Sequence, residues 1–151
     1  MRLSSWGGVL LLAWAGMLAL VGTTRAEEGT CRRIRAEIDL TDGTIAGNFG
    51  LNGTAVFVSD GQGTAPPTAP AGSSVFSGVL TISTERGALT LRETGMFSSR
   101  ADNPEGAVLA SWGDSPTGTG VFEGVTGDLF FAGRVVEGLF LVQVSGRLCR
   151  P

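Results

Sequence analysis

One acidic residue interrupts an apolar strand face and is the strongest candidate for chemistry in this chain. The segment 88–97 alternates with a period of two, which places Glu93 on its apolar face. The apolar members of that face are Leu89, Leu91 and Phe97. An inward Glu93 would need Arg134, Arg147 or an opening to solvent, because a buried carboxylate is costly without a partner, and it would then be a ligand anchor or a general base. We favour the simpler expectation that a bulge at Thr94-Gly95 carries Glu93 to water.

The other side chains restrict the chemistry that is available. Lysine, histidine and tyrosine are absent from the sequence. A serine nucleophile therefore lacks its usual histidine base, and metal ions lack imidazole ligands. The acidic residues Asp39, Asp42 and Asp60 do not have the spacing of a calcium-binding loop. We expect no metal and no cofactor.

The two cysteines, Cys31 and Cys149, lie near opposite ends of the chain and are expected to form a disulfide. In the loop-entropy model, closing a loop of roughly 100 residues contributes about 4 to 5 kcal/mol. Free thiols for redox or metal chemistry are the alternative, but the close CxxC spacing typical of such pairs is absent. A disulfide would hold the first and last strand regions side by side.

The first 26 residues have the organisation of a cleavable signal peptide: Arg2, an apolar run over residues 9–21, and Thr24-Arg25-Ala26 before the cleavage point. The apolar run is shorter than the roughly 20 residues that span a bilayer, so we expect no membrane anchor after cleavage. Residues 27–151 would then form a single secreted or periplasmic domain. Cleavage leaves nine of the 11 basic residues against 14 acidic ones. This negative balance disfavours nucleic acid and an anionic membrane as partners.

Alternating apolar and polar residues predict an all-β domain with tight turns between its strands. Asp42-Gly43 and Glu85-Arg86-Gly87 are the clearest turns. The expected strands cover residues 34–40, 45–51, 54–59, 75–84, 88–97 and 107–112, a bent pair within 117–136, and residues 138–148. About eight strands at hairpin spacing indicate an antiparallel barrel or a sandwich. A barrel of this size is either filled by side chains or wide enough for one small ligand.

Three polar segments are expected to interrupt these strands. Residues 60–74 contain three prolines and repeated glycines, which predicts a long exposed loop. We favour a tolerated surface insertion, and the alternative is a lid at the mouth of a barrel. Residues 98–105 are expected to form another polar loop, and residues 113–116 to end the strand before them.

The stretch 117–133 contains glycines that indicate a sharp corner in a sheet. Glycine permits positive φ and close backbone approach, and glycine at this density disfavours a helix. Four glycines are expected to act as structural turn residues: Gly118, Gly120, Gly124 and Gly127. The segment Gly120-Val121-Phe122-Glu123-Gly124-Val125, followed by Gly127, resembles the glycine-rich segment of plant allene oxide cyclases and their dirigent-like relatives. The likeness extends more loosely over residues 54–148.

The resemblance implies a small closed antiparallel β-barrel of about eight strands, in a family whose members are often homo-oligomers. In allene oxide cyclases an apolar cavity folds a reactive fatty-acid epoxide into a ring-closing shape. No catalytic residue of the family carries over by position, so the leading expectation is a secreted binding or interaction module that takes a small lipophilic ligand. Two alternatives stay open: an isomerase or cyclase acting on a lipophilic substrate through Glu93, and a purely structural secreted or cell-surface protein.

Overall fold

The computed structural model describes residues 29–100 and 103–151. The expected signal peptide, residues 1–26, lies outside the described residues. Within them are eight β-strands and one short 3-10 helix, η1. The bounds are β1 Thr30–Asp39, β2 Thr44–Gly47, β3 Gly53–Thr64, β4 Ser73–Thr84, β5 Gly87–Arg100, β6 Asn103–Gly118, η1 Gly120–Phe122, β7 Thr126–Val136 and β8 Leu139–Arg150. No helix in this part of the chain is long and apolar enough to cross a membrane.

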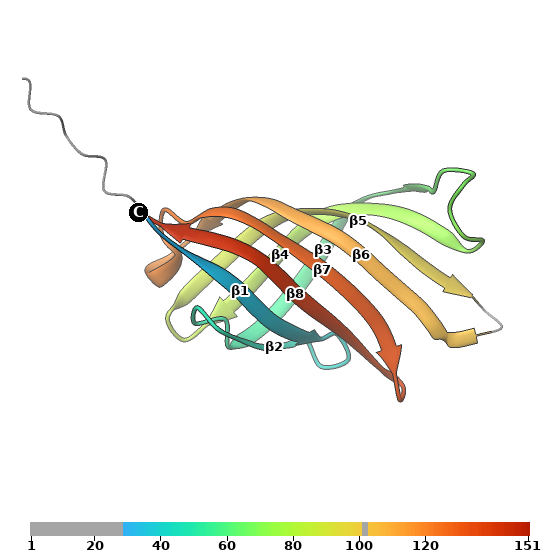
Figure 1. Cartoon of the computed structure of the whole chain (residues 1–151), viewed down its shortest axis with the longest axis horizontal. Helices are drawn as coiled ribbons and strands as arrows, with labels where there is room; N and C mark the ends of the chain where they lie inside the picture. Colours follow the sequence, from blue (N-terminus) through green and yellow to red (C-terminus); the bar gives the residue numbers. More distant parts are fainter. Residues whose placement is uncertain (1–28, 101–102) are drawn as a thin grey trace, which may run out of the picture.

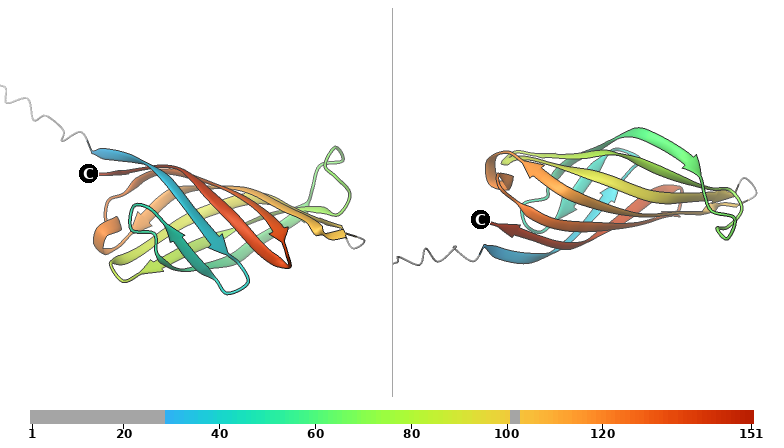
Figure 2. Two further views of the ribbon diagram at one scale, coloured as in Figure 1. Left: turned by 60° about the horizontal axis from the view of Figure 1, so that its bottom comes forward. Right: turned by 90° about the horizontal axis from the view of Figure 1, so that it is seen from above.

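The strands form one antiparallel sheet that closes on itself as a barrel in the order β1 to β8. Consecutive strands pair with each other, and β8 returns to pair with β1 along its whole length. Figure 1 and Figure 2 show the strands wrapping around one long axis, with the C-terminus at one end and the β3–β4 loop at the other. The expectation of about eight antiparallel strands closing into a ring is confirmed, and a two-sheet sandwich is excluded.

Period-two alternation decides which side chains fill the barrel. On β7, Leu129 and Phe131 are buried, whereas Phe130 between them is exposed. Fully buried apolar side chains gather toward the end that carries the C-terminus: Ile34, Leu51, Leu89, Phe122 and Leu148. Full burial of a side chain of this kind contributes about 1.5 to 3 kcal/mol, so this half of the barrel is its packed core.

The 3-10 turn η1 and its neighbours close the barrel at this end. The ring of Phe122, on η1, is fully buried and its centroid lies 6.4 Å from that of Phe49. The guanidinium carbon of Arg150 lies 3.9 Å from the centre of the Phe49 ring. A cation–π contact of this kind contributes about 0.5 to 2 kcal/mol. Together these groups plug the end of the barrel.

The four glycines expected at the corner surround this plug. Gly120, Gly124 and Gly127 have φ values of 60°, 68° and 125°, which residues with a side chain rarely adopt. At Gly118 an added Cβ would lie 2.5 Å from the carbonyl oxygen of Phe122. Backbone geometry and close approach therefore account for glycine at these positions.

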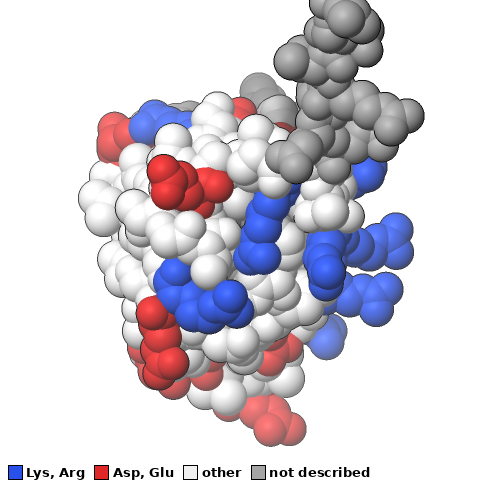
Figure 3. Space-filling model, turned by 90° about the vertical axis from the view of Figure 1, so that its left-hand side faces the viewer, with Lys and Arg blue, Asp and Glu red and all other residues white. Residues whose placement is uncertain are grey.

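The disulfide between Cys31 and Cys149 joins β1 to β8 where the ring closes. The two residues are 118 positions apart in the chain and lie directly opposite each other in the strand register. A shallow hollow beside them on the outer face is lined by Arg33, Arg35 and Arg147. Figure 3 shows basic side chains gathered on one side of this end of the molecule.

The expected loop over residues 60–74 is shorter in the structure. β3 continues to Thr64 and β4 begins at Ser73, so the loop spans only residues 65–72. Polar residues at the hairpin end still pair in register, as Thr64 does with Ser74, because ladder hydrogen bonds use backbone groups that any residue except proline supplies. The prolines lie within the shorter loop.

The expected loop over residues 98–105 and the expected end of a strand at residues 113–116 are both wrong. Residues 98–100 and 103–105 belong to the β5–β6 hairpin, and β6 runs through residues 113–116 without a break. The pairing register with β5 shifts near this point, and Ser115 has a positive φ of 49°. A bulge of this kind leaves one residue out of the ladder, which is where a strand tolerates a residue such as Pro116.

β2 is shorter than the alternation suggests. It ends at Gly47, and Phe49 has a positive φ of 62°. The Asn48 side chain replaces strand pairing here, because its Oδ1 accepts a hydrogen bond of 2.9 Å from the Arg35 N–H. Phe49 and Leu51 nevertheless pack against the core, as their apolar character indicates.

Candidate functional site

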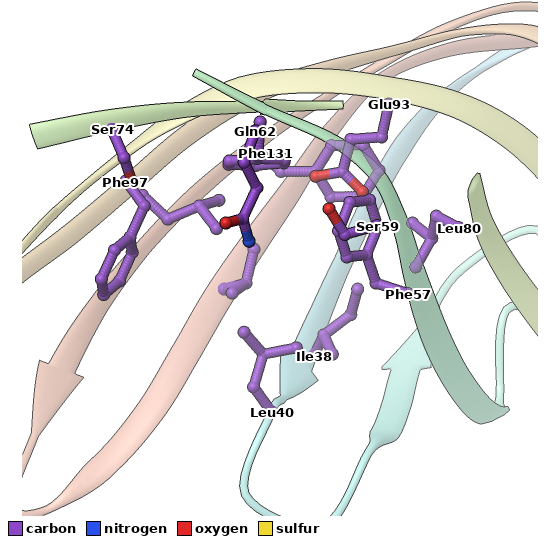
Figure 4. A pocket seen from close by; sticks show the side chains of 13 residues that line it. Ile38, Leu40, Phe57, Ser59, Gln62, Ser74, Leu80, Glu93, Phe97 and Phe131 are labelled. Atoms are coloured by element: carbon purple, nitrogen blue, oxygen red, sulfur yellow. The ribbon is translucent and has the colours of Figure 1, made fainter. Parts of the chain in front are cut away.

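An apolar cavity of about 270 Å³ occupies the half of the barrel opposite the plug. This volume is near the lower end of the range for small-molecule sites, roughly 300 to 1,000 Å³. Its lining comes from β1 and from β3 to β8: Ile38, Leu40, Phe57, Ser59, Gln62, Ser74, Phe76, Leu80, Glu93, Phe97, Leu109, Phe131 and Val142. Figure 4 shows side chains from several strands pointing into this common space.

The cavity lies at the end of the barrel where β1, β3, β5 and β7 end and β2, β4, β6 and β8 begin (Figure 1). The cavity reaches solvent at this rim, where four of its lining residues are exposed: Leu40, Ser59, Gln62 and Ser74. In the opposite direction, fully buried Leu89 and Leu91 continue the inward face of β5 toward the plug. The barrel is therefore filled at one end and hollow at the other.

Glu93 points into this cavity, which corrects the expectation that a bulge carries it to water. Its side chain is only 5% exposed. The register of β5 runs without a shift past Thr94 and Gly95 on both sides, to β4 and to β6. Because the bulges of β5 lie elsewhere, period-two alternation holds at Glu93 and turns it inward.

The partner of Glu93 is Ser111, and neither Arg134 nor Arg147 pairs with it. The Ser111 hydroxyl, itself buried, donates a hydrogen bond to Oε1 of Glu93. Gly95 lies opposite Ser111 in the register, and an added Cβ at Gly95 would lie 2.3 Å from the Ser111 Cβ. Gly95 thus makes room for the Ser111 residue, whose hydroxyl holds the carboxylate.

Two further glycines flank Glu93 in the sheet and give their space to aromatic rings. Glu93 lies opposite Gly78 on β4 and opposite Gly113 on β6. An added Cβ at Gly78 would lie 2.5 Å from Cζ of Phe57, and one at Gly113 would lie 3.1 Å from Cε2 of Phe131. The carboxylate therefore has an aromatic ring over each neighbouring strand.

Burial raises the pKa of the Glu93 carboxyl above its ordinary value of 4.5, and the hydrogen bond from Ser111 opposes this shift in part. A carboxyl of this kind can exchange a proton closer to neutral pH than a surface glutamate can. It can also pair with a charged or hydrogen-bonding group of a bound molecule. The geometry thus fits either an acid–base group or an anchor for a ligand.

The remaining polar groups lie toward the rim. Figure 4 shows Ser59 and Gln62 directed toward the same space as the Glu93 carboxylate. Ser59 lies one strand beyond Gly78, in the same row of the register as Glu93. The Ser59 hydroxyl already has backbone acceptors within 3.4 Å, on Gly61 and on Ser77.

Sequence reasoning identified Glu93 but missed Ser111, Gly78 and Gly113. A glycine inside a strand marks a close approach of another group, and this signal was present at both glycines. It does not say which group approaches, because the partners come from other strands. The cysteines and the four corner glycines do not line the cavity.

Within residues 29–100 and 103–151 no cluster of histidine, cysteine, aspartate or glutamate is suited to hold a metal ion. In comparisons with known proteins, no family model, no curated protein and no solved structure matches this chain. The geometry of the cavity and the sequence itself are thus the basis for inferring a function.

Proposed function

We propose that this protein is a secreted β-barrel of the allene oxide cyclase-like class that binds a small lipophilic ligand in its cavity. The observation that carries the proposal is the cavity of about 270 Å³, which occupies one half of a barrel whose other half is filled by buried side chains and η1. A purely structural barrel needs no such space and gains stability from filling it. The hollow interior therefore favours binding over a structural role.

Two further observations support the class and the location. The glycine-rich corner with Gly118, Gly120, Gly124 and Gly127 lies at the end of the barrel that η1 plugs, and the ring of eight antiparallel strands is the architecture that the resemblance implies. The disulfide fits an oxidising, extracytoplasmic compartment, as the signal-peptide pattern of the first 26 residues also indicates.

Filling the cavity tests the proposal. Leu109 lines the cavity, and Val108 beside it points to solvent on the same strand. Prodan, a neutral dye whose emission shifts to the blue in apolar surroundings, should bind the protein, and Leu109→Trp should weaken this binding at least about tenfold. Val108→Trp is the matched control and should bind as the wild type does. Equal binding by both variants, or no binding by the wild type, would contradict a ligand in the cavity.

A second candidate function is an isomerase or cyclase that acts on a lipophilic substrate. The buried carboxyl of Glu93, inside an open apolar cavity, is the observation that favours it. Glu93 would act as general acid or base, aided by its raised pKa. Chemical conversion of a bound molecule, lost in Glu93→Gln while binding persists, distinguishes this enzyme from a binding protein.

A further inference from the structure

Among the described lining residues of the cavity, the charge is of one sign only. Glu93 is the ionisable side chain in its described lining, and no arginine is among those lining residues. The other charged side chains described on the strands around Glu93 lie on the outer face or at its edge: Asp60, Arg92, Asp114, Asp128 and Arg134. Asp60 and Arg92 form an ion pair there, and β4 carries no ionisable residue.

The Glu93 carboxylate is only partly satisfied by the described residues. Its Oε1 accepts the hydrogen bond from Ser111, and no hydrogen bond from them reaches Oε2. An ionised carboxylate in an apolar environment keeps a strong preference for a further donor or a positive charge. A ligand that enters the cavity is in a position to supply it.

Aromatic rings also lie beside Glu93, and a cation bound there would gain further attraction from a ring face turned toward it. The Phe57 and Phe131 rings lie over the glycines on either side of the carboxylate. The ring of Phe76, also in the lining, is 5.4 Å from that of Phe57 in an edge-to-face arrangement. The faces of aromatic rings attract cations, and the attraction is larger in a desolvated site.

We propose that the cavity binds a small lipophilic amine in its protonated form, with the ammonium group on Glu93 and the hydrocarbon part against the phenylalanine rings. This inference rests on the proposed binding function and specifies its ligand class. Anionic amphiphiles such as fatty-acid carboxylates are disfavoured inside, because the described lining offers them no cation and Glu93 would repel them. Neutral ligands gain the apolar contacts but lack the charge pairing.

Three probes of one shape separate the ligand classes: 4-phenylbutylamine, 4-phenylbutan-1-ol and 4-phenylbutyrate. Isothermal titration of the full chain, expressed in a secreting host, should give an affinity for the amine that is about 10- to 100-fold higher than that for the alcohol, as for hydrogen bonds to charged groups. The carboxylate should not bind. Equal or tighter binding of the alcohol, or binding of the carboxylate, would overturn the amine proposal and leave the binding function intact.

The variant Glu93→Gln keeps the shape of the side chain and removes its charge. It should lose the 10- to 100-fold preference for the amine and keep the affinity for the alcohol. Glu85→Gln, in the exposed β4–β5 turn, is the matched control and should keep the preference. If Glu93→Gln retains the preference, the proposal is wrong.

If Glu93→Gln does not fold, the pH dependence of ligand binding by the wild type tests the proposal instead. Lowering the pH protonates Glu93 and should weaken amine binding while alcohol binding stays constant. Amine binding that does not change with pH would overturn the proposal. If prodan binds and none of the three probes does, the amine proposal fails alone, and if prodan also fails to bind, the binding function fails with it.

Discussion

The residues around Glu93 leave space for its side chain inside the barrel. The carboxylate loses its hydration there. Three glycines make the position possible: Gly95 leaves room for Ser111, while Gly78 and Gly113 leave room for aromatic rings. Burying a carboxylate with one hydrogen bond costs stability that a residue without charge would not cost. A position of this kind, where stability is given up, is typical of functional sites.

We expect Glu93→Gln to stabilise the protein increasingly as the pH rises. The pKa of Glu93 is raised in the folded state by burial, so the folded protein keeps this proton at pH values where the unfolded chain has lost it. Stability is therefore full below the ordinary value of 4.5 and falls as the pH rises through the raised value. The melting temperature of Glu93→Gln should exceed that of the wild type by an amount that grows from about pH 4 to about pH 8.

Two exposed carboxylates have lowered pKa values, so their effect on stability changes with pH in the opposite direction. This effect is the same in wild type and variant and does not alter the difference between them. Hydrogen bonds from Thr44 lower the pKa of Asp42, and a hydrogen bond from Arg92 lowers that of Asp60. The stability that they contribute is lost as the pH falls through their folded-state pKa values, in wild type and variant alike. Glu85→Gln should follow the wild type at every pH. A difference between Glu93→Gln and wild type that does not change with pH would contradict the assignment.

Among the elements, the corner between β6 and β7 has strict backbone requirements. Gly127 combines a φ of 125° with an added Cβ that would lie 2.1 Å from the carbonyl oxygen of Arg147 on β8. Gly124, at a φ of 68°, would meet only the Pro151 ring, at 3.0 Å. The two glycines are close in sequence and differ in what surrounds them.

Alanine substitutions should separate these two requirements. Gly124→Ala should cost about 1 to 2 kcal/mol, the strain of a left-handed residue. Gly127→Ala should cost more, about 3 kcal/mol or above, because it adds a clash with the backbone of β8 to the strain. Urea denaturation of both variants measures the difference. Equal free energies of unfolding would show that close approach to β8 contributes nothing.

For the whole molecule, the disulfide fastens the ring at the one pairing that links the ends of the chain. The loop it closes spans 118 residues. In the loop-entropy model a cross-link of this span contributes about 4 to 5 kcal/mol, much of the stability of a small domain. It lies on the outer face toward the plugged end and does not line the cavity.

The double variant Cys31→Ser and Cys149→Ser should therefore lose about 4 to 5 kcal/mol of stability and keep its binding where it remains folded. Urea denaturation gives the first quantity and prodan titration below the unfolding transition gives the second. Wild type treated with a reductant should match the double variant. Loss of dye binding by a variant that is still folded would mean that the cavity depends on the cross-link.

Local patterns account for much of what the sequence predicted correctly. Period-two alternation specified the inward faces of strands such as β7, and Asp42-Gly43 specified a turn, because each depends on residues that are neighbours in the chain. Strand ends were harder to place. Polar residues at 60–64 and a proline at 116 read as interruptions, yet the paired strand and a bulge keep both in the sheet.

The sequence alone determined an all-β chain and, for most strands, which side chains face the core. It also determined a glycine-rich corner and a cysteine pair able to join the two ends of the chain. Only the tertiary structure decided that Glu93 lies inside, that Ser111 is its partner and that half of the barrel is hollow. The reason is that these facts depend on groups from different strands. Gly95, Gly78 and Gly113 reveal what space they leave only once β3 to β7 are side by side.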